Sequence, residues 1–228
     1  MKTLVEFAAD QLRESILSGA LPPGEWIRLD AIAEELGMSP IPLREALRTL
    51  VTEGLVVPLP HRGFTVAPAT VEDLEETYRL RLVLEPLAVE LATPQLTPFE
   101  IKTLAGRLDR LARAFNEGDW QEYRTNHRAF HFGVYEKCGS AWLVRFIDML
   151  WLNTERYQRM TMQMKGELKQ RNREHRRVLA ACRARDAEAA GALMHDHLSQ
   201  ALVSLRKFLG ENAHLVDGTT SAEVTGAK

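Results

Sequence analysis

Residues 37–50 read Gly37-Met38-Ser39-Pro40-Ile41-Pro42-Leu43-Arg44-Glu45-Ala46-Leu47-Arg48-Thr49-Leu50, a pattern typical of an amphipathic helix. Ser39 is a favourable N-cap residue, and the prolines after it fall in the first helical turn, where a missing N–H costs nothing. Apolar residues at three- and four-residue spacing predict a buried stripe of Leu43, Ala46, Leu47 and Leu50. The opposite face then carries Arg44, Arg48 and Thr49, so two guanidinium groups one turn apart are expected to point outward.

A short β-hairpin is predicted directly after this helix. Beyond Gly54 the apolar period becomes that of strands, at residues 55–57 and 64–67, and the turn between them has His61-Arg62-Gly63 at its tip. A helix followed by a hairpin with a basic tip indicates a winged helix-turn-helix, in which the helix enters the DNA major groove and the wing lies along the backbone. The alternative is an ordinary helix and hairpin with two solvated arginines.

Two further helices are predicted upstream. Residues 7–17 carry apolar side chains at helical spacing and run into a Gly/Pro-rich stop at 18–25. Residues 29–36 predict a second short helix, ended by Gly37 in the position of a C-terminal cap. Three helices and a wing complete a DNA-binding domain, which we assign to residues 1–70.

Over residues 12–68 the chain resembles the N-terminal domain of bacterial transcription regulators of the GntR family. The resemblance rests on Leu21-Pro22-Pro23-Gly24-Glu25, Pro42-Leu43-Arg44-Glu45-Ala46-Leu47 and Glu53-Gly54-Leu55-Val56. The family usually has Arg where this chain has Pro40, and often Glu where it has Leu29, which implies a shifted operator preference. Together with the outward helix face, the resemblance implies DNA contacts from Arg28, Ser39, Arg44, Arg48, Thr49, His61, Arg62 and Gly63.

Composition predicts a globular protein of the cytoplasm. The 228 residues are 45% apolar and 26% charged, with a formal net charge of −2. Neither a signal peptide nor an apolar run of about 18 residues is found in the sequence. Cys138 and Cys182 lack the spacing of a metal or redox motif and are expected to pack as small hydrophobic side chains. Residues 1–70 carry six basic and nine acidic side chains, so DNA binding should depend on a few placed arginines and on dimeric avidity.

From residue 71 onward every segment has helical period. Helices are predicted at 71–92, 97–117, 119–138, 140–163, 167–184 and 186–209. The second of these opens with Thr97-Pro98-Phe99-Glu100, a capping box. The predicted fold is mainly α: an N-terminal winged helix-turn-helix followed by an antiparallel six-helix bundle at residues 71–210. Residues 211–228 are polar, small and aperiodic and are expected to form a disordered tail.

Histidines carry the chemistry of the predicted bundle. His127 and His131 stand at i and i+4 on one helix, the spacing at which two imidazoles can share one ion. His175 and His197 fall on the apolar stripes of two later helices, whereas His195 falls outside its stripe. A lone inward histidine is usually a hydrogen-bonded core residue, but four converging imidazoles favour a divalent metal site.

The same region resembles the FadR-type C-terminal domain, known as FCD. The resemblance rests on Arg81-Leu82-Val83-Leu84-Glu85-Pro86, Phe130-His131-Phe132-Gly133 and Glu174-His175-Arg176. Many such domains hold a metal with one Asp and three His in an effector pocket, which implies His131, His175 and His197 as ligands. The usual Asp is His127 here, and a neutral fourth ligand favours zinc or nickel. An open coordination position on the ion would bind a small organic acid, and Arg81 would bind the other end of that acid. The alternative for Arg81 is an ion pair with Glu85.

An enzyme is the competing class. His127-Arg128-Ala129-Phe130-His131 has the histidine spacing of a zinc hydrolase helix, but Arg128 replaces the general-base Glu, and no nucleophile motif is found elsewhere. A purely structural metal and a direct metal sensor also stay open. The expected function is that of a homodimeric repressor, not an enzyme, which binds a pseudo-palindromic operator and responds to a metal-held carboxylate, with no membrane partner.

Overall fold

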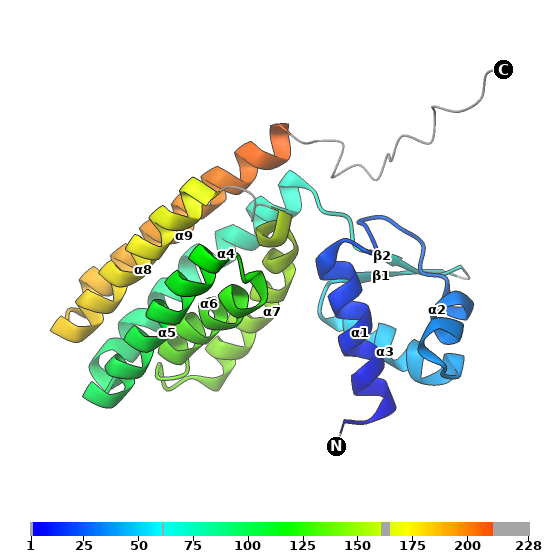
Figure 1. The fold of residues 1–228 in the computed structure, drawn as a ribbon, viewed down its shortest axis with the longest axis horizontal. Helices are drawn as coiled ribbons and strands as arrows, with labels where there is room; N and C mark the ends of the chain where they lie inside the picture. The colour runs from blue at the N-terminus through cyan, green and yellow to red at the C-terminus, as the bar shows by residue number, and fades with distance from the viewer. Residues whose placement is uncertain (1, 61, 161–164, 212–228) are drawn as a thin grey trace. The chain divides into compact units, whose positions relative to one another are not determined.

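The computed structural model describes residues 2–60, 62–160 and 165–211. Two sequence-based predictions therefore lie outside the described residues: the wing contact of His61 and, apart from Glu211, the tail at 211–228. The described chain is mainly helical with one small antiparallel sheet, which confirms the predicted fold class. Chain contacts divide it into two compact units (Figure 1), and the predicted domain boundaries at 70 and 210 stay a prediction.

The first unit contains Met1–Leu74, Trp151–Met160 and Arg206–Lys228, and the described part of its first segment forms three helices and two strands before α4. These elements are α1 (Leu4–Ser18), α2 (Leu29–Leu36), α3 (Pro40–Thr52), β1 (Val56–Leu59) and β2 (Gly63–Val66). Helix α1 begins before the predicted residue 7 because Thr3 and Glu6 form a capping box that satisfies its first N–H groups. Gly37 ends α2 in the left-handed conformation, as its cap position predicted.

Ser39 differs from the prediction in one respect. It occupies the N-cap position of α3 with an extended backbone, but its side chain makes no capping hydrogen bond. An N-cap oxygen usually accepts from the second or third helical N–H, and the third residue here is Pro42, which has none. Prolines stand in the first turn of α3, and the Ser39 hydroxyl accepts no hydrogen bond from that turn.

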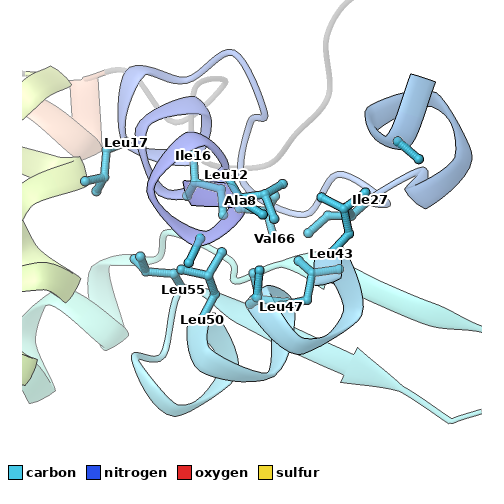
Figure 2. Packing of buried hydrophobic residues seen from close by; sticks show 14 residues of the cluster. Ala8, Leu12, Ile16, Leu17, Ile27, Leu43, Leu47, Leu50, Leu55 and Val66 are labelled. Carbon is cyan, nitrogen blue, oxygen red and sulfur yellow. The ribbon is translucent and has the colours of Figure 1, made fainter. Parts of the chain in front are cut away.

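The core of this unit is formed by apolar residues from every element (Figure 2). Leu43, Leu47 and Leu50 of α3 are fully buried, as the spacing predicted. They pack in one cluster with Leu12 and Ile16 of α1. The cluster leaves the other face of α3 exposed.

The wing is a two-stranded ladder with a third segment added along its second edge. β1 and β2 pair from Val56↔Val66 to Leu59↔Gly63. On the other side of β2, the Ile27 N–H donates to the Phe64 carbonyl at 2.9 Å and the Val66 N–H donates to the Glu25 carbonyl at 2.9 Å. Trp26 lies opposite Thr65 in this additional pairing.

The second unit contains most of six helices. They are α4 (Val71–Ala92), α5 (Pro98–Glu117), α6 (Trp120–Tyr135), α7 (Ala141–Met160), α8 (Lys165–Ala184) and α9 (Ala187–Glu211), with a short 3₁₀ turn at Thr93–Gln95. Thr97 and Glu100 form the predicted capping box of α5. Cys138 and Cys182 are buried and unlinked, as expected. Helix α5 packs against α6 and α8, with Leu111, Tyr123 and Leu168 in one buried cluster.

Helix α4 has an unusual distribution of side chains. Arg81 and Glu85 are buried, whereas Leu80, Val83, Leu87 and Leu91 are exposed. Pro86 lies inside the helix. A helix that buries its charges and exposes its leucines has polar partners inside the bundle and an apolar face outside it. In the part of the chain that the structure describes, no helix is long and apolar enough to cross a bilayer.

Candidate metal centre and DNA-facing groove

The outward face of α3 carries the residues that the sequence placed there. Arg44, Arg48 and Thr49 are all exposed. Arg48 forms an ion pair with Glu45 at 2.7 Å, one turn earlier on the same exposed face. A pair this exposed contributes little stability, so the guanidinium can exchange its carboxylate for a phosphate at small cost.

A groove in the first unit brings together side chains from three elements. It is lined by Arg28 and Asp30 near the start of α2, Arg44 on α3, and Arg62 and Gly63 of the wing. Gly63 has φ +98°, a conformation that side-chain-bearing residues rarely adopt. Ser39, Arg48 and Thr49 are not among the lining residues. Four of the eight predicted DNA contacts thus share one concave surface.

Trp26 also lines this groove, and the sequence analysis missed it. Its side chain is 56% exposed, unusual for so large an aromatic residue. Helical or strand periodicity could not find it, because it stands alone in a Gly/Pro-rich connection. The signal available was a single tryptophan two residues before Arg28.

The four predicted histidines converge in the second unit. His127 and His131 come from α6, His175 from α8 and His197 from α9. One ring nitrogen from each lies within 4.8 Å of the others. Three of the rings are buried and His127 is partly exposed. His195 is exposed on α9, as its position outside the apolar stripe predicted.

Hydrogen bonds orient two of the imidazoles. Tyr135 donates its hydroxyl proton to Glu85, so its oxygen accepts from His131 Nδ1–H over 2.8 Å. His197 Nδ1 lies 2.9 Å from Glu174 Oε2, which can only accept, so this nitrogen also carries the proton. Both rings therefore direct an unprotonated Nε2 into the cluster. Carboxylate support of this kind is typical of metal-ligating histidines.

His175 completes the cluster from α8. Its Nε2 lies 3.0 Å from His131 Nε2, so without an ion one proton is shared between the two nitrogens. Its Nδ1 is buried and has no hydrogen-bond partner among the described residues. Two nitrogens bound to one tetrahedral zinc ion are about 3.3 Å apart, so a cation in place of the shared proton requires only a small adjustment.

The electrostatic environment keeps these rings neutral. Burial lowers the pKa of His131 and of His175 well below 6.5, and the neighbouring imidazoles lower each further. The pKa of His127 is lowered well below 6.5 in the same way. Burial also lowers the pKa of His197, although Glu174 partly opposes it. Neutral imidazole is the form that binds metal ions.

Arg81 forms the ion pair with Glu85 that was the alternative to an effector contact. The pair is buried, and the guanidinium also lies over the Tyr78 ring, 4.8 Å from its centroid. Burial disfavours the cation, but Glu85 raises the pKa of Arg81 above its usual value, so the charge is kept. The Tyr78 hydroxyl is buried without a hydrogen-bond partner among the described residues.

A second groove reaches the histidines from solvent. It lies along α8 and α9 and is lined by Gln170, Glu174, His197 and Gln200 among others. Figure 1 shows these two helices running side by side. Of the four histidines, His197 is the one that lines this groove, together with its carboxylate partner Glu174.

A winged helix with an arginine-lined groove, joined to a helical bundle with a polar buried centre, defines a class of protein: DNA-binding regulators with a helical C-terminal domain. The profile of the bacterial regulatory proteins of the gntR family matches residues 4–66, and that of the FCD domain matches residues 76–200. The chain belongs to the GntR family, in the FadR-like subfamily with a C-terminal FCD domain.

Individual relatives agree with this assignment. The HTH-type transcriptional regulator McbR of Escherichia coli (strain K12) is 30% identical over 201 residues, which cover 86% of this chain and 90% of McbR. The structure of E. coli McbR/YncC matches with a TM-score of 0.79 at 29% identity, over 91% of this chain and 99% of that chain. The HTH-type transcriptional repressor GlaR of E. coli (strain K12) is 28% identical over 209 residues, covering 88% of this chain and 95% of GlaR. The protein is thus a transcription regulator and not an enzyme.

Proposed function

We propose that the protein is a homodimeric repressor in the cytoplasm, with residues 1–70 binding a pseudo-palindromic operator and residues 71–210 binding an effector. A relative named as a repressor supports the direction of regulation. The groove that contains Arg28, Arg44 and Arg62 supports a small set of placed contacts over general attraction to DNA. Arg48, Thr49, Ser39 and the wing residues His61 and Gly63 complete the proposed interface.

The observation that carries the effector proposal is the cluster of four neutral imidazoles. We infer that His127, His131, His175 and His197 hold a divalent metal ion, and a donor set of four nitrogens favours zinc or nickel over harder ions. When bound, the ion would supply a Lewis-acidic anchor for a carboxylate. The chain's own contribution is to fix the ring tautomers through Tyr135 and Glu174.

Arg81 and Tyr78 support a small organic acid as the effector. Arg81 is charged and buried close enough to lower the pKa of His131, so it belongs to the same polar interior. The buried Tyr78 hydroxyl has no partner among the described residues, and that guanidinium lies over the Tyr78 ring. A hydroxyl donor and a guanidinium together suit a carboxylate or hydroxy acid, which would draw on Arg81 beyond its bond to Glu85.

A purely structural ion is the second candidate, because four histidines can complete a tetrahedral site with no open position. A thermal-shift panel of small carboxylates, run with native metal and after chelation, separates the two. If one acid raises the melting temperature only when metal is present, the ion anchors the effector. If chelation lowers the melting temperature and no acid raises it, the effector proposal is wrong. A direct metal sensor would change operator affinity on metal loading alone.

The apolar face of α4 supports the homodimer. Leu80, Val83, Leu87 and Leu91 are exposed at helical spacing, and Val83 is 63% exposed. Trp142 and Phe146 of α7 add a second exposed pair, with ring centroids 6.1 Å apart. Self-association would bury both surfaces, and a charge in such a surface is costly. Light scattering should give a dimer for the native chain and a monomer for Val83→Glu, with Arg113→Glu, at an exposed position on α5, as the control for an added carboxylate.

A further inference from the structure

We infer that Trp26 is a positioning residue for the wing and that its indole ring contacts the DNA backbone. The inference rests on the DNA-binding function proposed above and adds a residue to which neither the family pattern nor the predicted interface gives a role.

The first argument is a hydrogen bond to the wing tip. Trp26 Nε1–H donates to the Arg62 carbonyl at 3.0 Å. The Arg62 N–H donates to the Leu59 carbonyl at 3.1 Å. Both backbone groups of Arg62 are thus engaged, one from β1 and one from Trp26. The guanidinium therefore extends from a backbone position that Trp26 helps to fix.

The second argument is the rigidity of the segment that carries Trp26. Main-chain hydrogen bonds join Glu25 and Ile27 to β2, and the Thr65 hydroxyl donates to the carbonyls of Gly24 and Glu25, each at 2.9 Å. Trp26 thus lies in a segment that is hydrogen-bonded along β2, opposite Thr65, and not in a loose loop. A rigid donor positions its acceptor more accurately than a mobile one, because less conformational entropy is lost when the bond forms.

The third argument is the exposed ring. More than half of the Trp26 side chain is exposed, and it lines the same groove as Arg28, Arg44 and Arg62. An indole has a single donor, and here that donor already binds Arg62. The ring is therefore left with apolar contact, for which deoxyribose is the suitable partner beside phosphates held by arginines. Such a contact adds affinity on any sequence and reads no base.

Two variants separate the two roles. Trp26→Phe keeps a ring and removes the N–H, whereas Trp26→Ala removes both. Affinities are measured by fluorescence anisotropy on a duplex selected from a random pool by the native chain, and on a scrambled duplex of equal length. Loss of one hydrogen bond should weaken binding by Trp26→Phe about 3- to 10-fold. Trp26→Ala should be weaker again by a similar factor on both duplexes.

A double-mutant cycle with Arg62→Ala provides the readout that a merely structural role would not give. If Trp26 acts through Arg62, Trp26→Phe has no further effect in the Arg62→Ala background, whereas the ring effect of Trp26→Ala persists. Equal effects of Trp26→Phe in both backgrounds, or none in the native one, would overturn the positioning role. Equal affinities of Trp26→Phe and Trp26→Ala would overturn the ring contact.

Controls keep this result distinct from a failure of the proposed function. Phe99→Ala removes an aromatic residue from α5 that is more exposed than Trp26, and it should leave DNA binding unchanged. Circular dichroism checks that each variant is folded, and Trp26→Phe tests the positioning role even if Trp26→Ala does not fold. If the native chain selects no duplex from the random pool, DNA recognition itself is wrong. If it binds normally and the cycle shows no coupling, only the role of Trp26 in positioning Arg62 is wrong.

Discussion

The arginine-lined groove of the first unit and the histidine cluster are built in opposite ways. The groove collects exposed cations from residues 28–62, close together in the sequence and held by short elements. The cluster collects buried neutral rings from three helices, with residues as far apart as His127 and His197. Exposed charges can be replaced singly at modest cost, whereas buried polar groups depend on each other's hydrogen bonds. Substitutions should therefore have local effects in the groove and cooperative effects in the cluster.

The largest expected effect comes from His175→Ala, which removes the central ring of the cluster. An ion at about a thousand times its dissociation constant adds roughly 4 kcal/mol, or roughly 8–16 °C for a chain of this size. Chelation should lower the melting temperature of the native chain by this amount and leave that of the variant unchanged. His195→Ala, an exposed histidine on α9, is the matched control and should respond like the native chain. A variant that still loses stability on chelation would show that the ion binds elsewhere.

Arg44→Ala tests the arginine-lined groove and has the second largest expected effect. It should cost about 1–3 kcal/mol of operator binding if the guanidinium reads a base, and the loss should be smaller on a scrambled duplex. Arg113→Ala, an exposed arginine on α5, should leave both affinities unchanged. An equal loss on both duplexes would instead make Arg44 a phosphate contact. Melting temperatures should not change, since the side chain is exposed.

Tyr135→Phe tests whether the cluster acts as a unit. Removing the hydroxyl breaks the link between His131 and Glu85, and loss of such a supporting hydrogen bond lowers metal affinity by about 10-fold or more. Competition with a chromophoric chelator measures the change. Tyr123→Phe is the control, since its hydroxyl contacts Asn172 at 3.4 Å and no imidazole. Equal affinities of the two variants would mean that the ring orientation does not depend on Tyr135.

The smallest expected effect comes from a partly exposed ion pair in the bundle, between Lys137 and Glu100, which contrasts with the buried cluster. The Lys137 ammonium, followed by hydrogen bonds with Thr97, lowers the pKa of Glu100 from 4.5 to about 2. A depressed carboxyl pKa stabilises the fold above about pH 4.5, and this contribution is lost as the pH falls toward 2. In Lys137→Gln an NMR titration should find the Glu100 pKa nearer 4.5. An unchanged pKa would assign the whole shift to the capping box.

Much of this organisation could be predicted from the sequence. Apolar spacing identified the buried face of α3, and the position of His195 outside its stripe separated it from the four converging histidines. These predictions succeeded because helical period determines which face a residue occupies. Tyr135 was also within reach, since it stands one turn after His131 on the same helix.

Other features depend on tertiary contacts that no local pattern records. Glu174 precedes His175 in the sequence but binds His197 on the next helix. The hydrogen bond between Trp26 and Arg62 joins a residue in the connection between α1 and α2 to a residue in the wing. Spacing could not decide whether Arg81 binds an effector or pairs with Glu85, because both roles place Arg81 on the same helix face.

Pro86 gives α4 a mechanical property that follows from its position. A proline offers no N–H to the carbonyl four residues earlier, which weakens the helix locally at Leu82. Glu85 and Arg81, the links to the histidine cluster, lie just before this joint, and the exposed Leu87 and Leu91 lie just beyond it. The helix thus lacks one main-chain hydrogen bond in the turn that carries both Glu85, which contacts Tyr135 of the cluster, and the exposed Val83.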